Sequence, residues 1–308
     1  MSKDSDPDMP DRARDAPDGA GGPDGRVRGH GPDAADLRQR QLAEHARHRR
    51  DVDAAYQAHD ARRAWAEAVP TLLEAWEEHK DKYPERIRAS PDTQPDGSWV
   101  AEGGRRLTPE QNAEATKACA DLRDEAGRVI LPAMRRVEAA SPDGRLAGLD
   151  HMLKGEDRLK EKIADELLAK PEKTIREAMN DIADPVRFTL TYPAERYAEG
   201  IKADVGWLKA EGFELIRLKN LWATDQYKGI NSQWRRPDTG TRLEMQFHTP
   251  ESLEAKELTH AAYERIRGSD VSPAEQRDLK KFQRKVNALL VIPSGTTDIK
   301  DFPEKNSG

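Results

Sequence analysis

Residues 242–248 combine side chains that can do chemistry with a pattern that fixes their direction. Apolar and polar residues alternate there, which predicts a strand with two unlike faces. The polar face carries Glu244, Gln246 and His248. A carboxylate, an amide and an imidazole in a row can ligate a metal, orient a hydroxyl or contact phosphate. An ordinary surface strand also tolerates polar residues on its outer face, so the segment by itself leaves both interpretations open.

A second predicted strand, residues 186–192, shows the same alternation and places Arg187 and Thr189 opposite its apolar side chains. Asp184 lies just before it. If the two strands are neighbours, Asp184 and Glu244 meet at one edge. Two carboxylates there can hold Mg²⁺, which keeps waters and substrate phosphates as its other ligands. The alternative is that Asp184 forms an ordinary cap and Arg187 an ordinary salt bridge.

A cluster of cations precedes these strands near the start of a helix predicted at residues 155–169. It comprises Lys154, Arg158, Lys160 and Lys162. The helix dipole favours anions at this end, so cations there are unfavourable unless an anionic ligand such as a triphosphate joins them. The alternative is a solvated helix face, because Glu and Asp are interleaved with the cations.

The order of these elements resembles that of the RelA/SpoT synthetase family, which includes the small alarmone synthetases. The segment 148–163 resembles the family's Arg-x-Lys and Ser-Leu/Ile-x-x-Lys motifs, and Asp184-x-x-Arg187 resembles its metal-binding Asp and nearby Arg. Residues 244–249 resemble its Glu-x-Gln-x-Arg-Thr strand, and residues 256–263 the helix that follows. The resemblance covers roughly residues 146–267.

This resemblance implies transfer of the β,γ-pyrophosphate of ATP to the 3′-hydroxyl of a nucleotide. The implied roles are catalysis and Mg²⁺ binding by Asp184 and Glu244, binding of the ATP phosphates by Lys154, Lys162 and Arg187, and substrate binding by Tyr227, Gln246 and His248. The implied cofactor is Mg²⁺. The implied partners are ATP and an acceptor, either GDP or GTP or an adenosine nucleotide. In this chemistry the protein mainly positions groups and neutralises charge.

Four positions depart from the family pattern. Met152 stands where the family has Arg, Arg158 where it has Ser, and His248 where it has the Arg of the strand motif. The Tyr of the family's Gly-Tyr-x-Ser, which stacks on the acceptor base, is Ile230 here, and Tyr227 is the candidate to replace it. These departures concern the acceptor more than the fold.

Three functions therefore stay open at this point. The first is a small-molecule synthetase. The second is a toxin of the same fold that acts on tRNA 3′ ends or drains ATP. The third is a catalytically silent binding or structural module. A basic track leading to Glu244 would favour action on tRNA. A closed nucleotide pocket would favour the small-molecule synthetase. Separation of Asp184 from Glu244 would favour the silent module.

The chain is expected to divide into four segments. They are a disordered tail at 1–34, a helical region at 35–145, a synthetase-like domain at 146–270, and a C-terminal helix and tail at 271–308. The helical N-terminal region is a candidate for binding a protein partner or for oligomerisation. The expected fold class is α+β, a small mixed nucleotidyltransferase-like sheet with helices packed on one face.

Local patterns predict the individual elements. Residues 35–82 are predicted helical, with a kink or a new helix at Pro70. Residues 83–107 are rich in turn formers. Thr108 begins a helix of about 30 residues with a break at Pro132. Besides the two strands above, strands are predicted at 213–218 and 227–234, and the tail after residue 293 is expected to be irregular.

Composition limits the remaining function classes. The net charge of −6 argues against non-specific attraction to nucleic acid through bulk charge. The single cysteine, Cys119, excludes an internal disulfide and a cysteine-only zinc site. The chain has no apolar run long enough for a membrane span and no apolar stretch of a secretory signal at its start. A cytoplasmic location is therefore expected.

Overall fold

A computed structural model describes residues 34–84, 89–268 and 271–303. The predicted disordered tail lies outside these residues except for residue 34. The chain divides into two compact units between residues 47 and 48, inside helix α1 (Ala34–Lys82). The first unit contributes only the first turns of that helix to the described residues. Everything below concerns the second unit.

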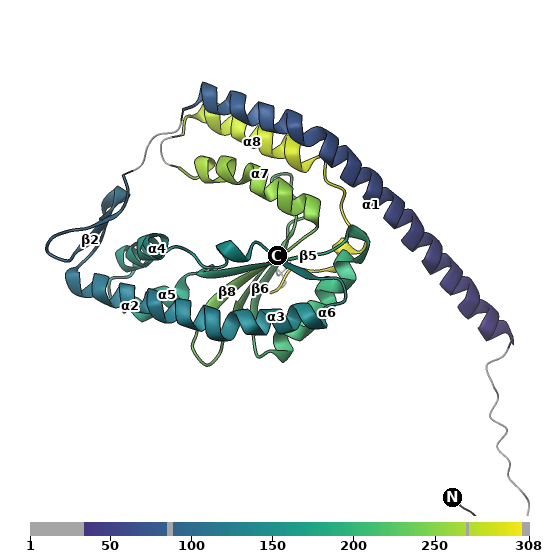
Figure 1. Cartoon of the computed structure of the whole chain (residues 1–308), viewed down its shortest axis with the longest axis horizontal. Helices are drawn as coiled ribbons and strands as arrows, with labels where there is room; N and C mark the ends of the chain where they lie inside the picture. The colour runs from purple at the N-terminus through teal and green to yellow at the C-terminus, as the bar shows by residue number, and fades with distance from the viewer. Residues whose placement is uncertain (1–33, 85–88, 269–270, 304–308) are drawn as a thin grey trace, which may run out of the picture. The chain divides into compact units, whose positions relative to one another are not determined.

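A five-stranded mixed sheet forms the centre of this unit (Figure 1). Its strands are β4 (Arg145–Ala147), β5 (Val186–Thr191), β6 (Glu214–Asn220), β7 (Ile230–Arg235) and β8 (Arg242–His248). Their order across the sheet is β4-β5-β8-β7-β6, and only the β5–β8 pair is parallel. The two strands that carry the candidate site residues are therefore direct neighbours, as the site hypothesis required.

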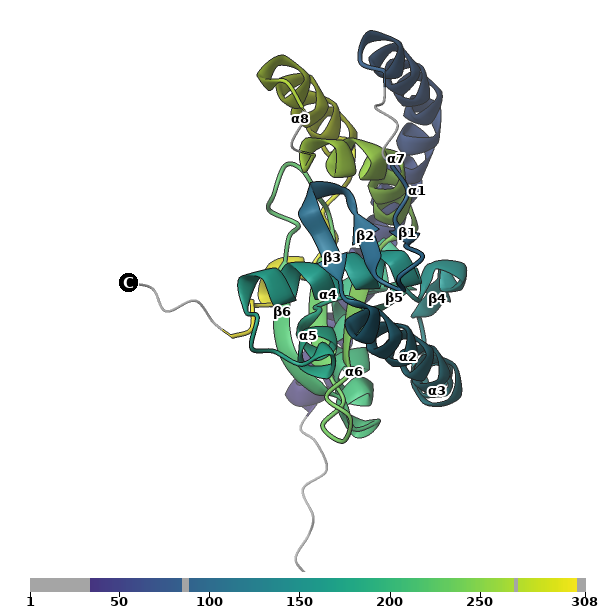
Figure 2. The ribbon, with the colours of Figure 1, turned by 90° about the vertical axis from the view of Figure 1, so that its left-hand side faces the viewer.

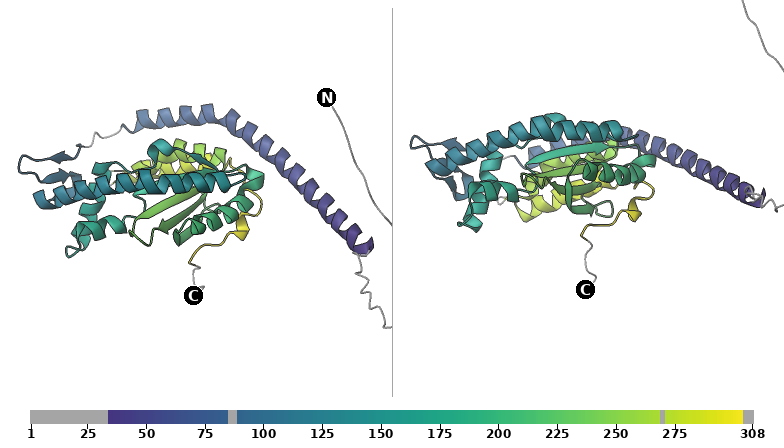
Figure 3. Two further views of the ribbon diagram at one scale, coloured as in Figure 1. Left: turned by 60° about the horizontal axis from the view of Figure 1, so that its bottom comes forward. Right: turned by 90° about the horizontal axis from the view of Figure 1, so that it is seen from below.

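The sheet has one apolar face and one polar face. The apolar face buries residues from β5, β8 and β7, among them Phe188, Met245 and Trp234. It packs against α2 (Pro109–Glu125), α3 (Leu131–Ala140), α4 (Glu156–Ala169), α5 (Ile175–Asp181) and α6 (Tyr197–Ala210) in one continuous core. Helices of the predicted 35–145 region thus share a core with the sheet, and Figure 3 shows α2 and α3 running along it.

The helix that begins after Thr108 follows its prediction with one refinement. Thr108 and Gln111 form a capping box. The predicted break at Pro132 is a turn of π-helix, Ala126–Ile130, that joins α2 to α3. Proline lacks an N–H and its ring collides with the carbonyl four residues earlier, so a wider turn just before it relieves the clash while the helix continues.

A second helical layer contains α7 (Pro250–Ile266), α8 (Pro273–Asn287) and the part of α1 after residue 47 (Figure 2). It has its own apolar cluster, centred on Trp65, Leu72, Leu279 and Val286. Polar contacts between α1 and α7 reinforce it: Arg62 Nε donates to Glu251 at 2.7 Å. In Figure 1 this layer and the helices α3 and α6 lie on opposite sides of the sheet. Helices therefore lie on both sides of the sheet, and not on one face as predicted.

Three other local features were decided by tertiary contacts. Residues 83–107 hold a small antiparallel sheet, β1 (Asp92–Thr93), β2 (Trp99–Ala101) and β3 (Arg105–Leu107), because Trp99 and Leu107 are buried in the core. Helix α1 continues through Pro70, so of the two predicted alternatives a new helix at Pro70 is excluded. The C-terminal tail is irregular, as predicted, except for a 3-10 turn at Thr296–Asp298, and it is held at the edge strand, where Leu218 and Phe302 exchange backbone hydrogen bonds. The predicted α+β class is confirmed.

No helix in the described ranges combines the length and apolarity that a membrane crossing requires.

Candidate functional site

Five predicted site residues lie in one chain of contacts on the polar face. Arg187 Nε donates to Glu244 Oε2 at 2.6 Å, and Arg187 Nη2 donates to Asp184 Oδ2 at 2.9 Å. Lys154 Nζ lies 3.1 Å from Asp184 Oδ2, and Lys162 Nζ lies 3.7 Å from Asp184 Oδ1. One guanidinium thus contacts both predicted metal-binding carboxylates, and both predicted phosphate-binding lysines meet at Asp184. The separation that would have favoured a silent module is not found.

Backbone pairing positions these side chains. Arg187 and Glu244 stand directly opposite each other in the parallel β5–β8 register. Lys154 follows a short bridge to β5: its N–H donates to the Pro185 carbonyl at 3.1 Å, and the Arg187 N–H donates to the Met152 carbonyl at 2.6 Å. Lys162 projects from the second turn of α4. Met152, a departure from the family motif, therefore holds Lys154 through its backbone, which is independent of the side chain.

The cluster carries an excess of positive charge. Lys154, Lys162 and Arg187 outnumber the carboxylates of Asp184 and Glu244 by one. Burial acts against the charged form of Arg187, but Glu244 and then Asp184 outweigh it, so the pKa of Arg187 is raised and the guanidinium stays protonated. An incoming polyanion would therefore be attracted to a partly buried site where screening by water is reduced.

Gln246 extends the cluster along β8. Its Nε2 donates to Glu244 Oε2 at 3.1 Å, and its Oε1 is buried without a hydrogen-bond partner among the described residues. Exchanging the amide nitrogen and oxygen would set two oxygens against each other, so this orientation is the favourable one. A buried oxygen acceptor without a donor is costly, which makes Gln246 Oε1 a candidate to receive a ligand.

Oxygen ligands for Mg²⁺ are present but few. No group of three or more His, Cys, Asp or Glu side chains with metal-binding geometry occurs in the described parts of the chain. Asp184 and Glu244 contact the same guanidinium and Gln246 lies beside Glu244, and Mg²⁺ usually takes only one or two carboxylates from a protein. These residues fit the ion, and their metal-binding role stays a prediction.

His248 and Tyr227 lie together at the end of β8 in a buried polar network. Tyr227 Oη donates to Asn231 Oδ1 at 2.7 Å and lies 2.8 Å from His248 Nε2, while His248 Nδ1 lies 2.9 Å from Ser252 Oγ. Each ring nitrogen of His248 therefore has a hydroxyl partner, Tyr227 at Nε2 and Ser252 at Nδ1. The Tyr227 ring is half-buried, and its role as a base-stacking surface stays a prediction.

Neutral His248 predicts acid sensitivity of the fold. Burial, and next the Lys256 charge, lower the pKa of His248 from 6.5 to about 3. Between these values the unfolded chain takes up a proton that the folded protein excludes, so stability falls as pH falls from about 6.5 towards 3. Between about pH 7.5 and 4.5, wild type should lose about 2–3 kcal/mol more unfolding free energy than His248→Gln.

Urea unfolding at the two pH values measures this difference. His260→Gln is the matched control, because His260 is an exposed histidine on α7. If His248→Gln and His260→Gln lose the same free energy as wild type on acidification, the buried imidazole is not the cause of the acid sensitivity.

Sequence reasoning missed the polar side chains that neighbouring strands add to this face. In the β7–β8 register, Gln233 pairs with Glu244 and Asn231 pairs with Gln246. In the β6–β7 register, Arg217 pairs with Gln233 and Lys219 pairs with Asn231. The alternation within each strand was readable from the sequence, but the order of strands in the sheet was not. The side chains that stand next to one another on neighbouring strands could therefore not be predicted.

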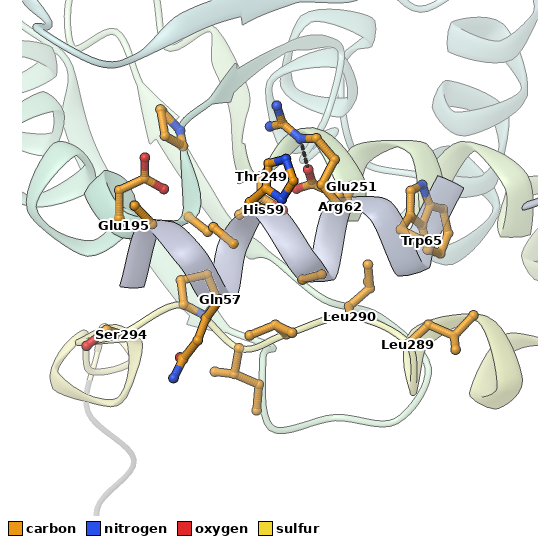
Figure 4. Close-up of a pocket in the computed structure, with 18 residues that line it drawn as sticks. Gln57, His59, Arg62, Trp65, Glu195, Thr249, Glu251, Leu289, Leu290 and Ser294 are labelled. Atoms are coloured by element: carbon orange, nitrogen blue, oxygen red, sulfur yellow. Dashed lines mark hydrogen bonds and ion pairs between the residues drawn. The ribbon is translucent and has the colours of Figure 1, made fainter. Parts of the chain in front are cut away.

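Two cavities in the described unit are relevant. A small one of about 60 Å³ lies against the cluster, lined by residues that include Gly148, His151, Arg187, Thr189 and Lys256. A larger one of about 410 Å³ lies between α1, the start of α7 and residues 289–294 (Figure 4). Its lining is largely aliphatic and its Arg62 is already paired with Glu251, as Figure 4 shows. The larger cavity lacks the cation and carboxylate cluster, so the candidate site is the polar face.

No family model and no curated protein matches the sequence. Solved structures do match. Small alarmone synthetase 1 from Bacillus subtilis, bound to its product pppGpp, matches with a TM-score of 0.39 and 14% identity over 58% of this chain and 93% of its own. Small alarmone synthetase 2 from Bacillus subtilis matches with a TM-score of 0.36 and 15% identity over 58% and 94%. A GTP pyrophosphokinase family protein from Streptococcus pneumoniae matches with a TM-score of 0.36 and 14% identity over 59% of this chain and 90% of its own.

Proposed function

We propose that this protein transfers the β,γ-pyrophosphate of ATP to the 3′-hydroxyl of an acceptor nucleotide. The observation that carries the proposal is the contact chain Lys154–Asp184–Arg187–Glu244, with Lys162 on the same Asp184, on the polar face of the sheet. This arrangement supplies surplus positive charge for a triphosphate and carboxylates for a metal and a proton. Those are the groups that phosphoryl-type transfer requires.

In the proposed reaction the 3′-hydroxyl oxygen forms a bond to the β-phosphorus of ATP. The bond from that phosphorus to the α,β-bridging oxygen breaks, and AMP leaves with that oxygen. Glu244, or a group that it orients, accepts the hydroxyl proton. Lys154, Lys162 and Arg187 neutralise the charge of the triphosphate, and Gln246 orients substrate through its free Oε1.

Mg²⁺, when bound by Asp184 and Glu244 with Gln246 beside them, would neutralise phosphate charge in this reaction. Arg187 holds the same two carboxylates apart at fixed positions, through its contacts of 2.9 and 2.6 Å. The carboxylates are thereby oriented before any ligand arrives, which reduces the reorganisation that binding would otherwise require.

The test is transfer from ATP labelled at its γ-phosphate, with Mg²⁺ present, to GDP, GTP, AMP, ATP or tRNA in separate reactions. The expected result is a labelled acceptor and one AMP released per transfer, which chromatography resolves. The reaction with ATP alone also controls for hydrolysis, because hydrolysis frees labelled pyrophosphate or phosphate, whereas transfer leaves the label on a nucleotide.

Each alternative function gives a different result in this assay. Label on the 3′ end of tRNA would show that the acceptor is a nucleic acid and not a small nucleotide. Release of AMP together with free labelled pyrophosphate from ATP alone would identify an enzyme that drains ATP. Absence of both labelled acceptor and AMP with every acceptor would refute enzymatic transfer and leave a binding or structural module.

A further inference from the structure

Lys256 is a cation beside the candidate site that has no role in the proposed reaction. It projects from the second turn of α7 and lines the 60 Å³ cavity together with Arg187 and Thr189 of β5. Its side chain is half-buried and makes no hydrogen bond or ion pair with any residue in the described ranges. A half-buried ammonium group without a partner is unfavourable, so its retention needs an explanation.

The surroundings of Lys256 are set by charges on three elements. Burial, and next the Arg187 charge, lower the pKa of Lys256, while Glu257 and Glu244 act in the opposite direction. With Lys256 and Glu257 included, the cluster holds four cations and three carboxylates. An anion in the cavity would contact Lys256 and Arg187 together and would remove the unfavourable proximity of these two cations.

The size of the cavity restricts what this anion can be. A volume of about 60 Å³ is far below the roughly 300 Å³ at which pockets for whole small molecules begin. It exceeds the ~15 Å³ that a single water molecule requires. A phosphoryl group fits this range, and a nucleoside does not. A terminal phosphoryl group is bonded to one neighbouring phosphate only, so it can enter such a space without the rest of the chain.

We propose that the cavity between Gly148, β5 and α7 binds the terminal phosphoryl group of the donor triphosphate, with Lys256 and Arg187 as its cationic contacts. This inference rests on the proposed function, since it takes a nucleoside triphosphate as the ligand. It adds to the donor site a cation from α7, an element that carries neither Lys154 nor Lys162. In this proposal α7 contacts the donor phosphates. The N-terminal helix contacts α7 through Arg62 and Glu251.

The test is calorimetric titration of Lys256→Gln with ATP, ADP and inorganic tripolyphosphate, without acceptor. Lys202→Gln is the matched control, because Lys202 is an exposed lysine on α6. Loss of a charge-assisted contact should weaken binding of ATP and of tripolyphosphate about tenfold and leave binding of ADP unchanged. Unchanged ATP affinity in Lys256→Gln, equal losses for ATP and ADP, or no ATP binding by wild type would each refute the proposal.

A stability measurement separates ligand binding from a structural role. Lys256→Met removes the unpaired ammonium but keeps the aliphatic stem, so its melting temperature should equal or exceed that of wild type while ATP affinity falls. A fall in both would refute the proposal. Loss of ATP affinity in a protein that transfers nothing would refute the proposed function alone. Transfer with wild-type ATP affinity in Lys256→Gln would refute the subsite alone.

Discussion

Glu244→Gln is expected to lower transfer of pyrophosphate by about a hundredfold to ten-thousandfold, the range for loss of a general base. Glutamine keeps the size of the side chain and can still accept from Arg187 Nε and Gln246 Nε2 through its amide oxygen. The substitution therefore removes the charge and the proton acceptor with little change in shape. Steady-state kinetics should place the loss in kcat rather than in the KM for ATP.

Glu214→Gln is the control for this experiment. Glu214 lies on the edge strand β6 and pairs with Arg235 at 2.6 Å in an exposed position. An exposed ion pair contributes little to stability, so Glu214→Gln should transfer at the wild-type rate. If Glu244→Gln also transfers at the wild-type rate, Glu244 neither accepts the proton nor holds the group that does.

Arg187→Lys is expected to lower transfer by about a hundredfold although it preserves charge. Arginine contacts two carboxylates at once because Nε and Nη2 point in different directions, to Glu244 and Asp184. A lysine ammonium is a single point on a flexible stem and does not reproduce the fixed, separate directions of Nε and Nη2. One carboxylate would then turn away, and the predicted metal and phosphate positions would be lost together. The measurement is kcat/KM for ATP at saturating acceptor.

Arg235→Lys provides the matched control, since Arg235 makes one exposed contact of the same length with Glu214. It should retain wild-type kcat/KM. Circular dichroism of Arg187→Lys should remain that of the folded protein, because the β5–β8 register is set by backbone pairing and buried apolar residues. Wild-type kcat/KM in Arg187→Lys would show that bridging of the two carboxylates has no part in catalysis.

The strands that carry the site were readable from local patterns because their chemistry alternates. Arg242–His248 was predicted with its observed bounds, and Val186–Thr191 with one residue too many. The cap at Thr108 was also readable, because a capping side chain acts within three residues. By contrast, the β1–β3 sheet has strands of two or three residues, too short for any periodic signal.

Residue types and their order along the chain thus determined the α+β class and named Lys154, Lys162, Asp184, Arg187 and Glu244 as one group. Tertiary structure alone decided that Arg187 contacts both carboxylates and that Lys256 lines the same cavity as Arg187 from another element. It also decided that Asn231 and Gln233 of β7 pair with Gln246 and Glu244 of β8. The physical reason is that local sequence fixes which face of a strand or helix is polar. Which elements become neighbours depends on packing of the whole core.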